Sequence, residues 1–406
     1  MDSQLKNYQY KKFCAYGFLK NLRFFDAFLL LFFVETGLSY TQVGLLYALK
    51  EIATNFLEFP SGLLADAYGR KRSLLVAFAC YILSFLIFYC SADLWLLSLA
   101  MLLYGVGDAF RSGTHKGMIM DYLKRNNWQD HKISYYGHTR SWSQKGSAIS
   151  ALVAGILVFW SGEYRVIFLC AIIPYLLNFI NILSYPEVLN FASKEKAPKP
   201  LREVWPQAWS AFKDSHVIYL INSSGLHSAY LKSIKDYIQP LMVHLVFLIP
   251  LSYNLTDKQG TGVAVGICFT IIYFLSSLAS KSAGRLSDSP IRRLEIKTLN
   301  LGLLSGLLCG LLYHWGWHIP ALFLFVGIYL IENIRKPILT GYMADKVSNE
   351  ILTSVISAES FYKTFVTAGI AVLLGRLADT IGIGMGMVIV CILLLLFSTL
   401  LSLKKN

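Results

Sequence analysis

Long apolar stretches, separated by short polar segments, recur along the whole chain. Each is about 20 residues or longer, the length that a helix needs to cross the hydrocarbon core of a bilayer. The pattern therefore predicts an all-α integral membrane protein with twelve transmembrane helices. The expected helices cover residues 13–36, 41–65, 73–91, 95–121, 134–160, 165–184, 216–240, 260–281, 294–314, 318–345, 351–374 and 382–403.

A polar hairpin between the second and third stretches has a weaker copy in the second half. Gly62–Lys71 has the sequence GLLADAYGRK, and 222 positions later Gly284–Arg293 has the sequence GRLSDSPIRR. Three charged positions inside the fourth stretch, Asp108, Arg111 and Asp121, recur 224 positions later as Glu332, Arg335 and Asp345. Such repeats are typical of duplicated membrane proteins. They predict two pseudo-symmetric six-helix halves, residues 1–184 and 216–406.

The segment between the halves, residues 185–215, is rich in Lys and Pro and is expected to be a cytoplasmic linker. Within it, Trp205, Trp209 and Phe212 stand at helical spacing. An amphipathic helix with this spacing lies along a membrane surface. We therefore expect residues 201–212 to form such a helix.

Composition and charge agree with a membrane protein. Of the 406 residues, 55% are hydrophobic and only 15% are charged, whereas soluble domains carry about 25% charged residues. Lys and Arg concentrate in alternate short loops, which predicts that both chain termini are cytoplasmic. The net charge of +13 is therefore not expected to bind nucleic acid. The expected location is the plasma membrane or the bacterial inner membrane.

Several kinds of chemistry are not expected. The seven cysteines show neither metal-ligand spacing nor a disulfide framework. The sequence holds no signature of zinc proteases, serine hydrolases or nucleotide-binding loops. We therefore expect no enzyme activity, no metal site and no cofactor.

The first hairpin also carries a more specific pattern. It consists of Gly62, Leu64, Ala65, Asp66, Gly69, Arg70, Lys71 and Leu74. This pattern resembles the loop between helices two and three of the major facilitator superfamily, although Ala67 stands where a basic residue is usual. The resemblance implies an alternating-access transporter of a small solute. The second copy departs further, with Ile291 in place of the second glycine.

The resemblance also implies a latch on the cytoplasmic face, in which Arg70 pairs with Asp121. An Arg guanidinium can bind a carboxylate through two hydrogen bonds, and the pair must break when the transporter changes conformation. Simple helix capping is the alternative. The expected latch residues are Gly62, Asp66, Gly69, Arg70 and Asp121, with Asp288, Arg292 and Asp345 in the second copy.

The string G-x-L-A-D occurs once more, at Gly375–Asp379. The charge pattern places this copy outside, and no basic run follows it. The short string alone is therefore weak evidence for a latch.

Charged side chains inside the apolar stretches point to a polar cavity. Each costs at least about 2.5–3.5 kcal/mol at the bilayer centre, so they must face one another or water. The resemblance implies that helices one, four, seven and ten line such a cavity. Cations outnumber acids there, so we expect an anionic or zwitterionic organic substrate. The candidate substrate-binding residues are Arg23, Arg111, His115, Arg140, Lys232 and Arg335.

Acids beside these cations are candidates for proton coupling. Burial favours the neutral form of a carboxylate and a nearby Arg opposes it, so opening a cavity changes how tightly a proton binds. Permanent salt bridges are the alternative. The candidates are Asp26, Asp108, Asp236 and Glu332.

The leading hypothesis is a proton-coupled secondary transporter that acts as a monomer in the lipid bilayer. A drug/proton antiporter is less well supported, because Ser112 and Gly113 follow Arg111 where such antiporters have the signature R-x-x-Q-G. A receptor or scaffold on the same fold would have no need of a polar cavity. The substrate's identity, the coupling ion and the direction of transport stay open.

Overall fold

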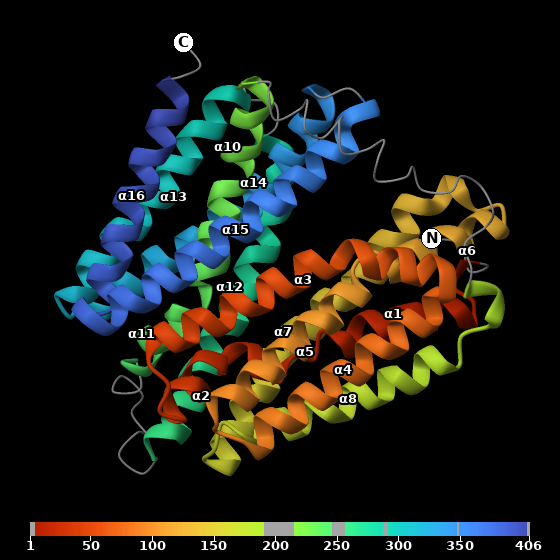
Figure 1. Cartoon of the computed structure of the whole chain (residues 1–406), viewed down its shortest axis with the longest axis horizontal. Helices are drawn as coiled ribbons and strands as arrows, with labels where there is room; N and C mark the ends of the chain where they lie inside the picture. The colour runs from red at the N-terminus through yellow and green to blue at the C-terminus, as the bar shows by residue number, and fades with distance from the viewer. Residues whose placement is uncertain (1–4, 191–214, 246–255, 287–290, 347–348, 404–406) are drawn as a thin grey trace. The chain divides into compact units, whose positions relative to one another are not determined.

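A computed structural model describes residues 5–190, 215–245, 256–286, 291–346 and 349–403, and within these ranges it is helical without a strand. Each of the twelve expected ranges contains helix (Figure 1). The amphipathic helix expected at residues 201–212 lies outside the described residues.

The described residues fold into two compact units. The first comprises residues 5–37, 49–190 and 256–270, and the second comprises residues 38–48, 215–245 and 271–403. The start of α3 therefore belongs to the second unit, and the start of α12 belongs to the first. The division into halves at residues 184 and 216 stays a prediction.

The first unit holds most of its helices in sequence order. They are α1 (Tyr8–Lys20), α2 (Leu29–Glu35), α3 (Tyr40–Tyr68), α4 (Arg70–Cys90), α5 (Leu94–Arg111), α6 (Thr114–Arg125), α7 (Lys132–Ser161) and α8 (Val166–Leu183). The second unit is built from the C-terminal helices. They are α10 (Ser215–Ile234), α11 (Ile238–Val243), α12 (Asp257–Leu286), α13 (Ile291–His314), α14 (His318–Lys346), α15 (Asn349–Ile381) and α16 (Ile383–Leu403).

Three expected helices are broken. The range 13–36 contains α1, a 3-10 helix at Phe24–Ala27 and α2. The side chain of Asn21 donates from Nδ2 to the carbonyl oxygen of Gly17 at 2.7 Å and helps to end α1. This side-chain bond competes with the helical backbone pattern. Arg23 and Asp26 therefore stand on non-helical or 3-10 backbone rather than on a continuous α-helix.

The other two breaks have backbone causes. Between α5 and α6, Gly113 has a φ of +70°, which glycine adopts at little cost. Between α10 and α11 lies a 3-10 helix at Lys235–Tyr237. Pro240 follows, and its ring would clash with the carbonyl of residue 236 in a continuous helix. In α11 the proline stands in the first turn, where it is tolerated.

Aromatic side chains fill the first unit. The ring centroids of Phe25 and Phe85 are 4.9 Å apart, and those of Phe85 and Tyr175 are also 4.9 Å apart. All three residues are buried. α4 packs along α5 and α8 around this core (Figure 1). Tilted and edge-on ring contacts of this kind add specific stabilisation to apolar burial.

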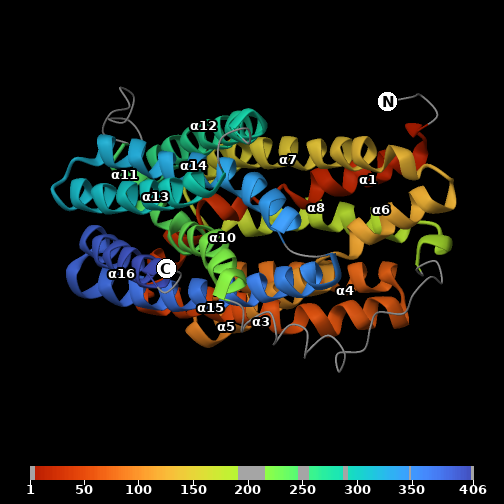
Figure 2. The same cartoon turned by 90° about the horizontal axis from the view of Figure 1, so that it is seen from above.

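In the second unit, α10 packs against α15, and α13 packs against both α14 and α16; Figure 2 shows α13 beside α14. The backbone at the start of α3 packs directly against α15 at Gly375. A Cβ added at this glycine would lie 2.3 Å from the carbonyl oxygen of Tyr40. Asp379 caps α3 by accepting from the N–H groups of Tyr40 and Thr41, both at 2.8 Å. The string G-x-L-A-D thus has a local packing role here.

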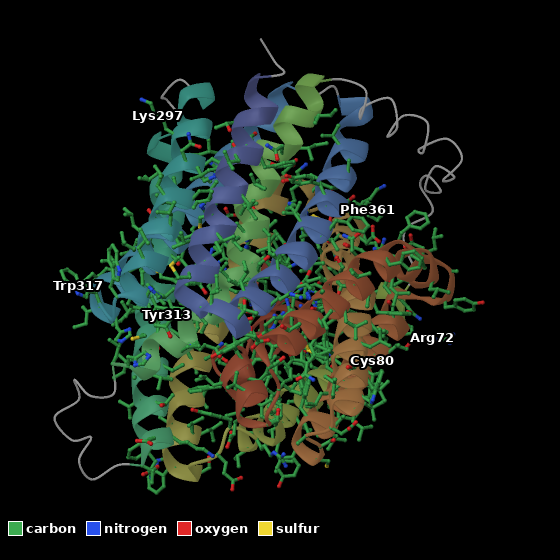
Figure 3. All side chains as sticks on the ribbon, turned by 60° about the vertical axis from the view of Figure 1, so that its left-hand side comes forward. Arg72, Cys80, Lys297, Tyr313, Trp317 and Phe361 are labelled. Carbon is green, nitrogen blue, oxygen red and sulfur yellow. The ribbon has the colours of Figure 1, made fainter. Side chains whose placement is uncertain are left out.

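The outward surfaces of the helices are apolar. Phe323 is 73% exposed and Phe365 66% exposed, as expected where lipid replaces water. Trp317 projects at the connection between α13 and α14 (Figure 3), and Trp residues are typical of membrane interfaces. Among the described residues, seven helical segments are long and apolar enough to cross a membrane: Arg70–Cys90, Leu94–Arg125, Gln129–Ser161, Val166–Leu183, Asp257–Ser276, His318–Lys336 and Ala358–Ile381.

Candidate functional site

Asp108, near the C-terminal end of α5, is the centre of a buried ion cluster in the first unit. Its Oδ1 accepts hydrogen bonds from Tyr81 Oη at 2.7 Å and from Arg111 Nη2 at 3.0 Å. Its Oδ2 lies 3.3 Å from Lys50 Nζ on α3. Arg111 Nε also donates to Tyr81 Oη, at 2.9 Å. One carboxylate therefore balances two cations. The expected pair of Asp108 and Arg111 lies at the centre of this ion cluster.

Arg23 and Asp26 lie at the break between α1 and α2. Arg23 Nη1 is 3.7 Å from Asp26 Oδ2, and the two side chains are 24% and 29% exposed. Non-helical backbone at membrane depth occurs only where protein surrounds it or where it lines a water-filled cavity. Lys20, the last residue of α1, interacts electrostatically with Arg23 and Arg111. The charged residues at this break therefore lie close enough to interact electrostatically with Arg111, the partner of Asp108.

We call this set the first-unit ion cluster. It consists of Lys20, Arg23, Asp26, Lys50, Glu51, Asp108 and Arg111. Four cations in the cluster face three carboxylates. When all seven groups are ionised, the cluster has one positive charge more than its own acids balance.

Lys50 is a member of this cluster that the sequence did not single out as a candidate. Besides Asp108, its Nζ also contacts Glu51, at 3.4 Å. The Lys-Glu dipeptide inside an apolar stretch was the available signal, because ionisable residues at membrane depth are rare and tend to be functional.

His115, on α6, is held by aromatic groups rather than by the acids. Its ring stacks on Tyr16 with centroids 3.5 Å apart. Its Nε2 is 3.2 Å from Tyr185 Oη. This packing fixes the orientation of the imidazole beside the first-unit ion cluster, which also interacts with Tyr16 through Arg111 and Arg23.

Two expected substrate ligands are placed differently. Arg140 is exposed on α7 and Lys232 is exposed on α10. Among the residues that the structure describes, no ion pair joins Arg140 to the first-unit ion cluster. Asp236, in the break after α10, is buried, and its Oδ1 lies 3.9 Å from Lys235 Nζ.

Glu332, on α14, forms a second buried site within the second unit. Its Oε2 is 2.7 Å from Nδ1 of His227, and its Oε1 accepts a hydrogen bond from Ser228 Oγ. His227 and Ser228 are consecutive residues of α10, so one turn of that helix holds both carboxylate oxygens. His227 is fully buried. Sequence reasoning missed it, although a His inside an apolar stretch was a usable signal.

Arg335, three residues after Glu332, is 2% exposed. It donates from Nη1 to Thr298 Oγ1 at 2.5 Å and from Nη2 to the carbonyl oxygen of Ser223 at 2.7 Å. The arginine therefore links α14 to α13 and α10.

The structure brings the expected latch pair together in the first unit. Arg70 Nη1 is 2.5 Å from Asp121 Oδ2, and Arg70 Nε is 3.5 Å from Asp66 Oδ1. One guanidinium at the start of α4 thus joins the ends of α3 and α6. The latch role itself stays a prediction.

Gly69 is needed at this loop for two reasons. Its φ is +107°, and a Cβ there would lie 2.2 Å from the side-chain oxygen of Asn190. Asn190 also accepts from the N–H of Arg70 at 2.7 Å and, through Oδ1, from the N–H of Lys71 at 3.0 Å. The loop is therefore bound to the segment that follows α8.

The other expected latch residues differ in status. Gly62 lies inside α3, and a Cβ there would meet nothing within 4 Å, so no close packing in the described structure requires a glycine at this position. Asp288 lies outside the described residues. For Arg292 and Asp345 the structure describes the helical backbone but not the side chains.

Comparison with known proteins identifies the fold family. The Major Facilitator Superfamily matches residues 16–365. The chain belongs to this superfamily. The fold class, an all-α multi-pass membrane protein with the superfamily's architecture, is thereby confirmed.

Two curated relatives come from Bacillus subtilis (strain 168). One is a hexuronate transporter, 25% identical over 261 residues, which are 63% of this chain and 57% of that protein. The other is an uncharacterized transporter of the same superfamily, 32% identical over 90 residues, 22% of this chain and 23% of that protein. The chain thus matches little more than half of the first relative's length.

Solved structures agree over nearly the whole chain. The nucleoside transporter NupG has a TM-score of 0.73 at 16% identity, covering 99% of this chain and 98% of that one. A bacterial homolog of the human lysosomal transporter Spinster has a TM-score of 0.69 at 13% identity, covering 97% and 96%. At these identities the likeness shows the fold alone.

Proposed function

We propose that this protein is a proton-coupled secondary transporter that moves a small anionic or zwitterionic organic solute by alternating access. The observation that carries the proposal is the excess positive charge of the first-unit ion cluster. The cluster stands at the breaks of two helices, and broken membrane helices commonly supply substrate sites in transporters.

An anionic substrate would balance this cluster. Buried charges are stable only when they are paired, and Asp108 is already shared between Arg111 and Lys50. A carboxylate that binds beside Arg23 would supply the missing negative charge. Arginine suits this task because its guanidinium can bind a carboxylate through two parallel hydrogen bonds.

The hexuronate transporter among the relatives is consistent with such a substrate, since a hexuronate is a sugar that carries a carboxylate. We propose Arg23 and Arg111 as the main substrate-binding residues, with His115 oriented beside them. Arg140, Lys232 and Arg335 are the further candidates.

Proton coupling requires an acid whose partners permit it to gain a proton. We propose Glu332 for this role, because its two hydrogen-bond partners in the described structure are His227 and Ser228. Asp26, Asp108 and Asp236 are the other candidates. Asp108 is the weakest of them, because protonation there would remove the negative charge that Lys50 and Arg111 share.

The Arg70–Asp121 pair is proposed as the conformational latch, with both termini in the cytoplasm. The pair and Asp66 join three helix ends through one guanidinium. Breaking the Arg70–Asp121 pair would remove this link between α4 and α6 at that end.

The test is uptake into proteoliposomes that contain the purified protein. The probes are radiolabelled glucuronate, glucose and tetraphenylphosphonium, with and without an inward proton gradient. We expect glucuronate to enter and the other two probes to stay out. In Arg111→Gln we expect uptake to fall by about tenfold or more, as the loss of a charge-assisted hydrogen bond worth about 1.5–3 kcal/mol implies.

The matched control is Lys116→Gln. Lys116 is an exposed cation on α6 whose ammonium lies over the ring of Tyr136, and its removal should leave uptake as in the wild type. Movement of tetraphenylphosphonium alone would favour a drug/proton antiporter and contradict an anionic substrate. If none of the probes moved and binding alone were found, a receptor or scaffold would replace the transporter proposal.

A further inference from the structure

The environment of Glu332 suggests how a proton is held in the second unit. This inference rests on the proposed proton-coupled function and deepens it. His227 Nδ1 and Glu332 Oε2 are 2.7 Å apart, and Ser228 Oγ donates to the other carboxylate oxygen. An ionised carboxylate only accepts hydrogen bonds, so a neutral His227 must carry its proton on Nδ1 when Glu332 is ionised.

The imidazole has one hydrogen-bond partner, Glu332, in the described structure. His227 is fully buried, and its Nε2 has no hydrogen-bond partner among the described residues. The ring lies directly against α13, because a Cβ at Gly302 would fall 2.0 Å from Nε2. Any proton exchange by this ring in the described arrangement therefore goes through Glu332.

The charged and titratable groups around the pair come from every helix that packs on α10. They are Arg335 on α14, Glu359, Tyr362 and Lys363 on α15, Cys391 on α16, Cys309 on α13, and Tyr230 on α10 itself; α13 also contributes the backbone at Gly302.

Most of these groups already have partners of their own. Glu359 lies 3.0 Å from Lys363 Nζ and also accepts from Ser224, and Tyr230 Oη is 3.1 Å from Cys391 Sγ. Arg335 donates to Thr298 and to the Ser223 carbonyl, and its charge acts on Glu332 through space.

We propose that His227 and Glu332 form one proton-carrying unit, in which His227 positions and shares the proton that Glu332 takes up. Without the carried proton, the pair is a carboxylate and a neutral imidazole, with a net charge of −1. With it, the pair is neutral, either as acid and imidazole or as carboxylate and imidazolium. One N–H or O–H bond forms, and the proton comes from water and returns to water, so no other reactant is needed.

Loading thus changes the charge beside Arg335 by one unit. The unloaded pair attracts the guanidinium of Arg335, and the loaded pair does not. Arg335 links α14 to α13 and α10 through its hydrogen bonds. Binding of the proton therefore weakens the electrostatic attraction on an arginine that connects three helices.

The first test needs no substrate. The infrared band of a protonated carboxylic acid is followed against pH in the reconstituted full-length protein. We expect a titrating band that disappears in Glu332→Gln. In His227→Gln its midpoint should move by about one pH unit or more, because a coupled titrating partner is lost.

Glutamine at position 227 tests the proposal because its amide can donate a hydrogen bond to Glu332 but does not titrate. A merely structural role would therefore be restored by it, and the midpoint would stay at the wild-type value, which would overturn the proposal. The control is His244→Gln, since His244 belongs to the same unit but is exposed and stacks on His318. That change should leave the band as in the wild type.

A second arm measures coupling directly. In His227→Gln we expect glucuronate accumulation driven by a proton gradient to fall at least about tenfold more than glucuronate exchange without a gradient. An equal fall in both would contradict the proposal.

The infrared titration and the transport measurement distinguish a failure of the His227–Glu332 pair from a failure of the proposed substrate. If wild-type protein did not move glucuronate but the band titrated and responded to position 227, the substrate would be wrong and the pair would stand. If His227→Gln did not fold, His227→Asn would take its place, because asparagine can donate from the position of Nδ1 but does not titrate. A wild-type midpoint there would equally contradict the pair's role.

Discussion

Asp108 and Glu332 occupy matching positions in the two halves of the sequence, each three residues before an arginine, yet they have different partners. Asp108 accepts from its own Arg111 and from Tyr81, and it also pairs with Lys50. Glu332 instead bonds to His227 and Ser228. The arginine of the second site is directed to Thr298 and a backbone carbonyl.

This difference shows that an acid–arginine spacing of three does not determine a salt bridge. Neighbouring helices decide the outcome. In the first unit α3 supplies a lysine and α4 a phenol, so the carboxylate is shared between fixed charges. In the second unit α10 supplies an imidazole and a hydroxyl, so the carboxylate has partners that can accept a change of protonation. Duplication preserved the pattern while the two sites acquired different chemistry.

The largest expected effect distinguishes the two sites by stability. Asp108→Asn removes a buried carboxylate and leaves the half-buried Lys50 and Arg111 without their shared counter-charge. Removing one partner of a buried ion pair typically costs about 3–5 kcal/mol. We expect a clear fall in the thermal unfolding midpoint of the protein in detergent. Adding Lys50→Met should recover part of the loss, and a midpoint equal to the wild type would show that the cluster is not electrostatically coupled.

The matching change in the second unit should have a smaller effect. Glu332→Gln keeps the size of the side chain, and its amide can bond to both His227 and Ser228. We expect a loss of no more than about 1.5 kcal/mol, the contribution of an ordinary hydrogen bond. The same thermal measurement gives the comparison with Asp108→Asn. If Glu332→Gln were the more destabilising of the two, the proposed contrast between a fixed and a titrating carboxylate would fail.

The smallest effect is expected at an exposed pair that serves as a baseline. Lys71 Nζ donates to Glu187 Oε1 at 2.6 Å, and this hydrogen bond lowers the pKa of Glu187 below its usual value of 4.5. A carboxyl whose pKa is lower in the folded state adds stability above its unfolded pKa and loses it as the pH falls. Glu187→Gln should therefore flatten the acid side of the stability profile slightly.

This pair is exposed to water and screened by salt, so the flattening should shrink at high ionic strength. The measurement is the unfolding midpoint of the wild type and of Glu187→Gln from neutral pH down to about pH 4. The difference between the two proteins should be largest near neutral pH and should shrink as the pH falls; a difference that grew toward about pH 4 would have the wrong sign and would contradict the assignment.

Much of the fold was predictable because lipid imposes a simple rule. A chain that crosses hydrocarbon must satisfy its backbone within helices, so apolar length alone located all twelve helical ranges. The breaks at Arg23, Gly113 and Asp236 were not predicted. Each depends on a local feature, such as the Asn21 side-chain bond or Pro240, that a count of apolar residues does not register.

The candidate site was predictable only in part. Charge at membrane depth identified Arg23, Asp108 and Glu332, because such residues are too unfavourable to occur without a role. Lys50 and His227 escaped notice because their importance lies in what they touch. Lys50 lies far in sequence from Asp108, and His227 lies far in sequence from Glu332.

The sequence by itself determined a duplicated helical membrane protein and indicated some of the charged residues at membrane depth, since length, hydropathy and loop charge are local properties. Only the tertiary structure decided which charges are paired. Lys50 reaches Asp108 and His227 reaches Glu332 because packing brings separate helices together, and hydrogen bonds form only within about 3 Å. Which residues become hydrogen-bond partners therefore depends on how the helices pack rather than on the spacing of residues along one helix.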